Sequence, residues 1–271
     1  MEQKKIINLY PNNNHKSLSI SLQVQDKLES KGFEISYENN PNADLNICIG
    51  GDGAFLRAVH KSNFSKIPFV GINTGHLGFY QEILIPNIEK FIDEYLNDNY
   101  EIEALDLLEA KAHFNSSAKV FTYNALNEFV VKSSDSSIIH LDVFIDGNHL
   151  ETFAGDALLV STPSGSTAYN FSAGGSILYH SLNGYQLTPL APINSKAYRS
   201  LFNSIVIPSK STLRIKVRQE DIESGSTLII DGVTEKYEDL DYIDFKISTK
   251  KISKLSFYKD WYWLNIKDKF L

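Results

Sequence analysis

The sequence predicts two domains, an α/β domain with a parallel sheet and a second domain of mostly antiparallel β-strands. Strand and helix patterns alternate over the first hundred residues, which is typical of parallel strands joined by right-handed crossovers. After about Glu101, apolar and polar residues alternate instead, as in strands with one solvent-facing side. The third observation is the segment 49–53, where a glycine-rich turn follows a buried strand.

The elements of the first domain follow one another closely. Ile20, Val24 and Leu28 recur at helical spacing, and Gly32 stands where a helix C-terminal glycine is expected. The short apolar runs of this half are typical of buried strands. The expected order is strand 5–10, helix 17–31, strand 45–49, a helix through Phe55, Leu56 and Val59, strand 67–72, a loop at 73–80 and helix 86–97.

This order also predicts where a ligand binds. Open parallel sheets bind ligands beyond the carboxyl ends of their strands. The turn at 50–53 and the loop at 73–78 both follow strands at that edge, so we expect them to face one crevice.

The second domain contains a clear alternation of strand residues at 141–146. Leu141, Val143 and Ile145 alternate with Asp142, Phe144 and Asp146, and the Asp-Gly-Asn sequence at 146–148 has hairpin-turn chemistry. Segments 213–218, 228–230 and 255–257 have similar strand patterns. The aromatic tail at 261–263 is too apolar to remain in water, so we expect it to dock. The predicted boundaries are 1–100, 101–250, and a tail at 251–271 that returns to the first domain.

Composition narrows the class of protein. The net charge of −7 over 271 residues and a pI near 5.5 argue against a nucleic-acid-binding protein. The single cysteine, Cys48, lies in an apolar strand and is expected to be a small buried hydrophobe in a reducing compartment. Neither a membrane-spanning stretch nor a signal peptide is found, so we expect a cytoplasmic protein that does not enter membranes.

The segment 49–53 reads Ile-Gly-Gly-Asp-Gly and is the main candidate for chemistry. Glycine has no Cβ to keep a phosphate away, and backbone N–H groups in such turns bind anions. Asp52 is then a candidate acid or base. The alternative is an ordinary tight turn between a strand and a helix. The motif is neither a Walker A loop nor the dinucleotide Gly-x-Gly-x-x-Gly fingerprint.

Other segments also combine glycines or strand ends with hydroxyl, amide or carboxylate side chains. They are Asn-Thr-Gly-His-Leu-Gly-Phe at 73–79, Asn-Glu at 127–128, Gly-Asp at 155–156, Ser-Thr-Pro-Ser-Gly-Ser-Thr-Ala-Tyr at 161–169 and Gly-Gly at 174–175. Asn127 and Glu128 could be an ordinary strand entry, and His76 an ordinary loop histidine. The hydroxyl-rich stretch lacks a Gly-x-Ser-x-Gly elbow, and no catalytic triad can be assigned. Hydrogen bonding to a polar ligand is its better functional interpretation.

Together these segments closely resemble the NAD kinase family, in the order and roughly the spacing of its bacterial ATP-NAD kinases. The resemblance implies a Rossmann-like first domain, a sandwich-like second domain and a site between them. It implies a phosphotransferase that moves the γ-phosphoryl group of ATP to the 2′-hydroxyl of the adenosine ribose of NAD, giving NADP. It also implies Mg²⁺ or another divalent metal with ATP, and a homotetramer whose neighbouring subunit often completes the site.

The resemblance assigns roles to residues. Asp52 would be the catalytic base, and Gly50, Gly51, Gly53 and Arg57 would bind ATP phosphates. Asn127 and Glu128 would hold the adenosine end of NAD, Asp156 the nicotinamide end, and Tyr169 has the shape to pack on a base. The further NAD-binding positions are Asp52, Gly53, Asn73, Phe79, Tyr80, Ala154, Ser164, Thr167, Ala168, Asn170, Phe171, Ser172 and Ala191. No metal ligand is assigned.

Three positions depart from the family pattern. Ala54 stands where Thr is frequent, which removes a hydroxyl from the phosphate turn. Ala154 replaces a basic residue, and Val233 follows Asp231-Gly232 where a polar residue is usual. Two other functions stay open at this stage. One is a lipid kinase of the diacylglycerol-kinase type, which carries a related glycine turn; the other is a non-catalytic sensor that binds NAD or NADP.

Overall fold

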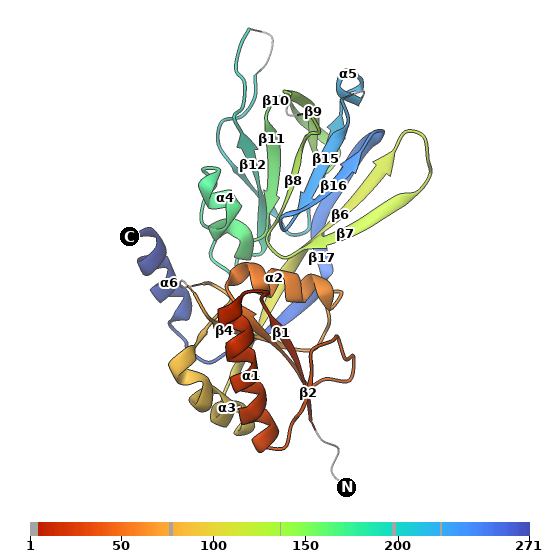
Figure 1. Ribbon diagram of the computed structural model, residues 1–271. Helices are drawn as coiled ribbons and strands as arrows, with labels where there is room; N and C mark the ends of the chain where they lie inside the picture. The colour runs from red at the N-terminus through yellow and green to blue at the C-terminus, as the bar shows by residue number, and fades with distance from the viewer. Residues whose placement is uncertain (1–4, 76–77, 136, 197–198, 223) are drawn as a thin grey trace. The chain divides into compact units, whose positions relative to one another are not determined.

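The chain forms two compact units. The computed structural model describes residues 5–75, 78–135, 137–196, 199–222 and 224–271 (Figure 1). The first unit, here called the α/β unit, comprises Met1–Leu105 and Lys251–Leu271, and the second, the β unit, comprises Asp106–Lys250. Within the described residues, no helix is both long and apolar enough to cross a membrane.

The α/β unit is built on a parallel sheet. Its strands are β1 (Ile6–Pro11), β2 (Glu34–Ser36), β3 (Leu45–Gly50), β4 (Phe69–Asn73), the short β5 (Ile83–Leu84) and the last residues of β17 (Leu240–Ser256), in the order β17-β4-β3-β1-β2 with β5 beside β4. Gly50 pairs with Asn73 at the carboxyl ends of β3 and β4. The two loops therefore leave adjacent strands at one edge, which confirms that part of the expected arrangement.

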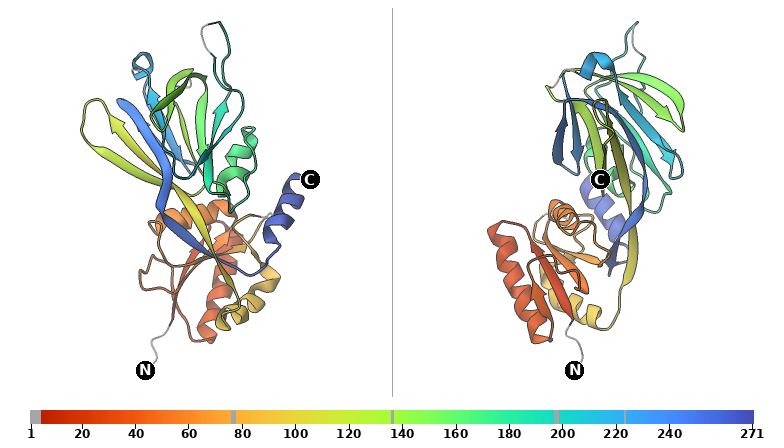
Figure 2. Two further views of the ribbon diagram at one scale, coloured as in Figure 1. Left: turned by 180° about the vertical axis from the view of Figure 1, so that it is seen from behind. Right: turned by 90° about the vertical axis from the view of Figure 1, so that its right-hand side faces the viewer.

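Helices cover both faces of this sheet (Figure 2). The helices are α1 (His15–Ser30), α2 (Asp52–Lys61), α3 (Ile88–Leu96) after the 3₁₀ turn η1 (Ile85–Asn87), and α6 (Trp261–Phe270). Buried residues of α1 and α3 share one core with Val70 and Ile72. Phe55 of α2 packs against Phe69, ring centroids 5.7 Å apart. Because neighbouring strand residues point to opposite faces, α2 covers the other side.

The ends of these helices differ slightly from the expected ones. Helix α1 begins at His15 because the Asn14 side chain accepts a hydrogen bond from the Ser17 amide at 2.8 Å, as an N-cap does. The expected helix at 86–97 is divided, since Pro86 lies in the 3₁₀ turn that precedes α3. The aromatic tail forms α6, and Trp261 is 9 % exposed. The sequence patterns did not predict this helix.

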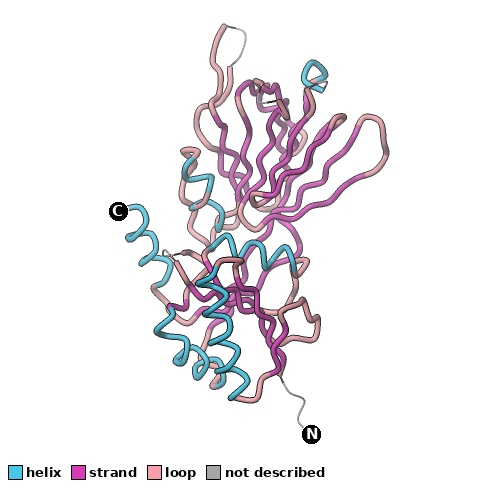
Figure 3. Tube along the Cα trace, in the orientation of Figure 1, coloured by secondary structure: helices cyan, strands magenta, loops and turns pink. Residues whose placement is uncertain are grey.

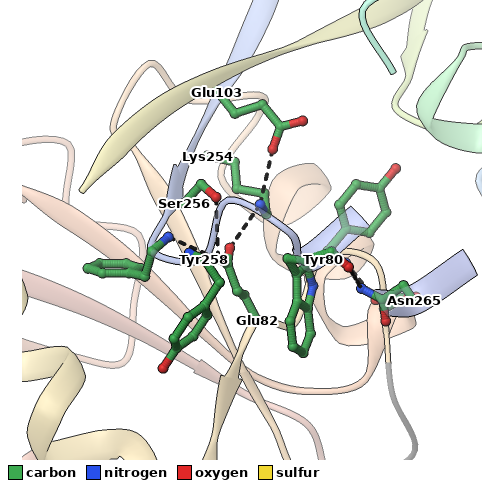
Figure 4. Close-up of polar contacts among 10 residues, drawn as sticks. Tyr80, Glu82, Glu103, Lys254, Ser256, Tyr258 and Asn265 are labelled. Carbon is green, nitrogen blue, oxygen red and sulfur yellow. Dashed lines mark hydrogen bonds and ion pairs between the residues drawn. The ribbon is translucent and has the colours of Figure 1, made fainter. Parts of the chain in front are cut away.

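A buried carboxylate ties the C-terminal segment to the rest of the α/β unit (Figure 4). Glu82 is completely buried and accepts hydrogen bonds from the amides of Phe257 (2.9 Å) and Tyr258 (2.6 Å). Lys254 Nζ lies 3.2 Å from Glu82 and 3.1 Å from Glu103. Burial lowers the pKa of Lys254, but the two carboxylates outweigh burial and raise the pKa above its ordinary value.

The β unit is a sandwich of two antiparallel sheets, whose strands are drawn in magenta in Figure 3. One sheet has the order β13-β12-β11-β8-β15-β16, and the other contains β10-β9-β14-β17 with β6 and β7. Leu108, Phe129, Phe153 and Phe245 belong to the single core between them. The strands are β6 (Glu101–Phe114), β7 (Val120–Ala125), β8 (Glu128–Ser133), β9 (Ile139–Ile145), β10 (Asn148–Gly155), β11 (Ala157–Ser161), β12 (Gly184–Leu190), β13 (Ile205–Pro208), β14 (Leu213–Val217), β15 (Ser226–Ile230) and β16 (Val233–Tyr237).

The turn between β9 and β10 follows the sequence prediction. Asp146 and Gly147 have φ values of 50° and 79°, the left-handed pair that a two-residue hairpin needs. Short helices occur outside the sheets of this unit: η2 (Ser164–Thr167), α4 (Tyr169–Ser172) and α5 (Gln219–Ile222). The fold class expected from the sequence is confirmed in both units.

We predict that the buried pair of Glu82 and Lys254 is essential to stability. Lys254→Met keeps the side-chain volume but leaves a buried carboxylate without its cation, so the free energy of unfolding should fall by about 3 kcal/mol. Lys31→Met is the matched control, because Lys31 and Asp93 form an exposed pair in the same unit at 3.2 Å. The control should change by less than about 1 kcal/mol. Urea unfolding measures both; equal changes would contradict the prediction.

Candidate active site

Asp52 is the first residue of α2, and its carboxylate is held by the main chain of a neighbouring loop. Oδ2 accepts the Phe79 amide and Oδ1 the Tyr80 amide, each at 3.0 Å. Lys269 Nζ lies 3.4 Å from Oδ2. A negative charge at this position also meets the positive end of the helix dipole. The carboxylate is thus oriented while still partly exposed, as a group that acts on a ligand must be.

Two glycines set the space around this carboxylate. A Cβ on Gly78 would lie 2.3 Å from Asp52 Oδ1, so only glycine lets the loop approach this closely. A Cβ on Gly51, in contrast, would meet nothing within 4 Å. Packing therefore does not require glycine at position 51, and the space beside this residue is open.

The other predicted residues of this unit lie around the same turn. Asn73 is buried, and its Oδ1 accepts the Gly75 amide at 2.8 Å. Tyr80 is buried and stacks on Phe55, centroids 4.8 Å apart. Phe79 lies between the rings of Tyr262 and Phe270, 6.1 Å from each. His76 lies outside the described residues.

A pocket of about 280 Å³ lies along α2, from Ala54 to Lys61. Arg57 lines it and donates from Nη2 to Asn12 Oδ1 at 2.8 Å. The pocket is lined by Leu9, Tyr10, Pro11, Asn12, Asn13, Tyr37, Ala54, Arg57, Ala58 and Lys61. Arg57 is among the phosphate-binding residues expected from the sequence, whereas Lys61 and Asn12 are not; the position of Asn12 just beyond a parallel strand is the signal that could have indicated it.

Ala54 has a packing role that the sequence did not indicate. A Cβ on Gly50 would lie 2.6 Å from the Ala54 methyl group, and Ala54 is buried. The side chain at position 54 therefore packs against the glycine turn.

In the β unit, Asp231 organises the segment that carries Asn127 and Glu128. Its carboxylate accepts the amides of Leu126 (2.8 Å), Asn127 (2.7 Å) and Glu128 (3.1 Å). The Asp231 amide donates in return to the Glu128 carbonyl at 3.1 Å. Asp231 thereby fixes the main chain from which both predicted ligand-binding side chains extend.

Glu128 is a buried acid with unused hydrogen-bonding capacity. It is 8 % exposed, and within the described chain Oε2 has no hydrogen-bond partner. Burial, and secondarily the charge of Asp231, raises the pKa of Glu128 to about 8. The carboxyl group is therefore mainly protonated at neutral pH and can donate as well as accept a hydrogen bond.

The hydroxyl-rich stretch closes around the same main chain. The Thr162 amide donates to the Asn127 carbonyl at 2.9 Å, and Thr162 Oγ1 donates to the Leu126 carbonyl at 2.6 Å. A Cβ on Gly165 would lie 2.1 Å from the Asn127 carbonyl oxygen, which explains glycine at that position. The structure thus brings segment 161–167 against Asn127, as a shared site requires.

The NAD-binding residues expected between positions 154 and 191 differ in their access to solvent. Asn170 is fully buried; its side chain donates to the Ser166 carbonyl (3.1 Å) and accepts from Thr188 Oγ1 (2.7 Å), so it shapes the loop. Tyr169 is 46 % exposed. Phe171, Ser172, Asp156 and Ala191 are exposed, Ser164, Thr167 and Ala168 are half-buried, and Ala154 is buried.

In the α/β unit, the site residues are the oriented carboxylate of Asp52 and the glycine turn beside it. In the β unit, they are Asn127, the buried acid Glu128 and the hydroxyl-rich segment 161–167. Comparison with protein-family models identifies both halves. Residues 10–100 match the ATP-NAD kinase N-terminal domain, and residues 126–255 match the ATP-NAD kinase C-terminal domain. The chain belongs to the NAD kinase family.

Curated relatives agree with this assignment. The chain is 64 % identical over 268 residues to an NAD kinase of Finegoldia magna, covering 98 % of both chains. It is 36 % identical over 236 residues to an NAD kinase of Staphylococcus aureus, covering 86 % of this chain and 87 % of that one. Whole-chain similarity to NAD kinases removes the support for a lipid kinase that the glycine turn alone left open.

Solved structures show the same fold. A yeast NADH kinase complexed with NADH has a TM-score of 0.86 at 20 % identity, covering 99 % of this chain and 88 % of that chain. An NAD kinase from Archaeoglobus fulgidus in complex with ATP has a TM-score of 0.74 at 21 % identity, covering 98 % of each.

The raised pKa of Glu128 predicts a specific pH dependence of stability. Between pH 4.5 and about 8 the unfolded chain releases this proton while the folded chain retains it, so the free energy of unfolding should fall as pH rises. The slope from this group is at most about 1.4 kcal/mol per pH unit. Glu128→Gln should remove it. Denaturant unfolding from pH 5 to 8 tests this, with the exposed Glu38→Gln as control; parallel curves for wild type and Glu128→Gln would contradict it.

Proposed function

We propose that this chain is an ATP-dependent NAD kinase that phosphorylates the 2′-hydroxyl of the adenosine ribose of NAD, with Asp52 as the base. The observation that carries the role of Asp52 is its carboxylate, fixed by two main-chain amides beside a glycine turn that is open to a ligand. The identity to NAD kinases over the whole chain supports the reaction. The complexes of related proteins with ATP and with NADH support the classes of ligand.

In this reaction the oxygen of the ribose hydroxyl bonds to the γ-phosphorus of ATP while Asp52 accepts the proton of that hydroxyl. The bond between the γ-phosphorus and ADP breaks, and ADP leaves. General-base assistance of this kind contributes about 10²–10⁴-fold. An alkyl hydroxyl is a weak nucleophile, so alignment with the phosphorus and charge neutralisation supply much of the remaining rate. The fixed orientation of Asp52 contributes to that alignment, because its carboxylate cannot rotate without losing the amides of the neighbouring loop.

The phosphate donor is proposed to bind at the start of α2. Gly50, Gly51 and Gly53 let main-chain amides approach the triphosphate, and Arg57 lines the adjoining pocket with a guanidinium group. Within the described residues, no three His, Cys, Asp or Glu side chains gather as a metal site would need. Mg²⁺ would therefore enter as the counter-ion of ATP, bound through the phosphate oxygens, and would neutralise charge on the transferred group.

The dinucleotide is proposed to use the remaining residues. Asn127 and the protonated Glu128 bind the adenosine end, Asp156 the nicotinamide end, and the exposed ring of Tyr169 packs on a base. Asn170 acts through the loop that it holds. Gly53, Asn73, Phe79, Tyr80, Ala154, Ser164, Thr167, Ala168, Phe171, Ser172 and Ala191 complete the proposed set.

We also propose a homotetrameric, cytoplasmic enzyme, on the resemblance to bacterial members of the family. The assembly is tested by light scattering coupled to size exclusion at several protein concentrations. A stable monomer that turns over NAD at the full rate would contradict it.

Asp52→Asn should lower kcat for NADP formation by about 10²–10⁴-fold, because the amide keeps the shape but cannot take the proton. A coupled assay with NAD, ATP and Mg²⁺ measures the rate, and thermal unfolding verifies the fold. Asp26→Asn, an exposed position on α1, is the matched control and should keep full activity. Near-normal turnover in Asp52→Asn would remove Asp52 as the base. A wild-type chain that binds NAD yet releases no ADP would instead identify a non-catalytic sensor.

A further inference from the structure

The C-terminal helix brings a cation to the proposed base. Lys269 lies near the end of α6 (Trp261–Phe270), and its Nζ is 3.4 Å from Asp52 Oδ2. The two side chains are 30 % and 27 % exposed, so the pair is partly shielded from water but open to a ligand. None of the sequence patterns indicated this contact, which joins residues 217 positions apart.

The position of Lys269 is fixed by packing as well as by charge. Its Nζ lies 4.7 Å from the centre of the Phe79 ring, a cation–π distance. The same ring packs against Tyr262 and Phe270 of α6. Phe79 also supplies one of the two amides that hold Asp52. Lys269 and the loop that orients Asp52 therefore form one packed group.

The helix is anchored independently at its start. Glu82 holds the amides of Phe257 and Tyr258 just before the helix, as Figure 4 shows for the contacts of Glu82. Asn265, fully buried, donates from Nδ2 to the Trp261 carbonyl at 3.0 Å, and Trp261 is itself buried. The anchored start of the helix and the burial of Trp261 and Asn265 limit the positions that Lys269 can take.

The contacts of Asp52 differ between its two carboxylate oxygens. A carboxylate has about four lone-pair sites, two on each oxygen. Oδ2 uses both of its sites, for the Phe79 amide and for Lys269, while Oδ1 uses one for the Tyr80 amide. Counting contacts with the described residues alone, the acceptor site that remains is on Oδ1, so the Lys269 contact selects the oxygen that can accept a ligand hydroxyl.

We propose that Lys269 is a positioning residue of the kinase reaction, which directs Oδ1 of Asp52 to the acceptor hydroxyl. This inference rests on the proposed role of Asp52 as base. The ammonium group also places a positive charge beside the Asp52 carboxylate, on Oδ2, as the negative phosphates approach.

Lys269→Met tests the inference, because it keeps much of the stem over Phe79 and removes the charge. We expect kcat to fall about tenfold, with KM for NAD and for ATP changed by less than about twofold, as for a lost alignment. Lys269→Arg should recover most of kcat. Lys267→Met is the matched control: Lys267 is an exposed lysine two positions earlier on the same helix, where it faces another direction. It should behave as wild type.

A double-mutant cycle separates this inference from the proposed function. If Lys269 acts through Asp52, Asp52→Asn and the double variant Asp52→Asn/Lys269→Met should have the same residual rate. A further fall of about tenfold in the double variant would overturn positioning. So would an unchanged kcat in Lys269→Met, or a raised KM for ATP with kcat kept, which would indicate direct phosphate binding. Full activity of Asp52→Asn would instead remove the base itself, and the inference with it.

Discussion

Carboxylates that accept hydrogen bonds from successive main-chain amides hold the segments on which both units depend. Asp52 accepts two adjacent amides, Glu82 accepts those of Phe257 and Tyr258, and Asp231 accepts three in a row. Such bonds are stronger than neutral ones, and two or three from one chain segment fix its direction as well as its distance. In the α/β unit the arrangement is sequential, because Glu82 directly follows the loop that holds Asp52.

What surrounds each carboxylate decides its effect on the neighbouring groups. Glu82 and Asp52 each have a lysine nearby in the α/β unit, Lys254 and Lys269 respectively. Asp231 has Glu128 as a neighbour, and a second negative charge there would be buried as well as repelled. Glu128 responds by keeping its proton. In the β unit, the carboxylate that holds the main chain therefore also raises the pKa of the acid beside it.

The sequence predicted the parts of this structure that depend on neighbours along the chain. Periodicity located β1, β3, β4, α1 and the hairpin between β9 and β10, and the position of Asp52 followed from the strand and glycines beside it. Contacts between distant residues left no such pattern. Nothing local distinguishes Glu82 as the partner of residues 254–258, or Lys269 as a contact of Asp52. Asn170 was assigned to a ligand by the resemblance to the family, and its burial and its bonds to Ser166 and Thr188 show that it also holds the loop together.

The place of the C-terminal segment in the α/β unit follows from these same contacts. Strands β6 and β17 each have residues in both units, so the chain leaves the α/β unit once and returns to it. The return supplies the cation and the amides that a buried Glu82 requires, since an ionised side chain without them is expensive to bury. It also supplies the rings that cover Phe79. The packing around the loop that orients Asp52 is therefore completed by residues of the segment 251–271. The α/β unit that contains the proposed base is built from this segment and from residues 1–105.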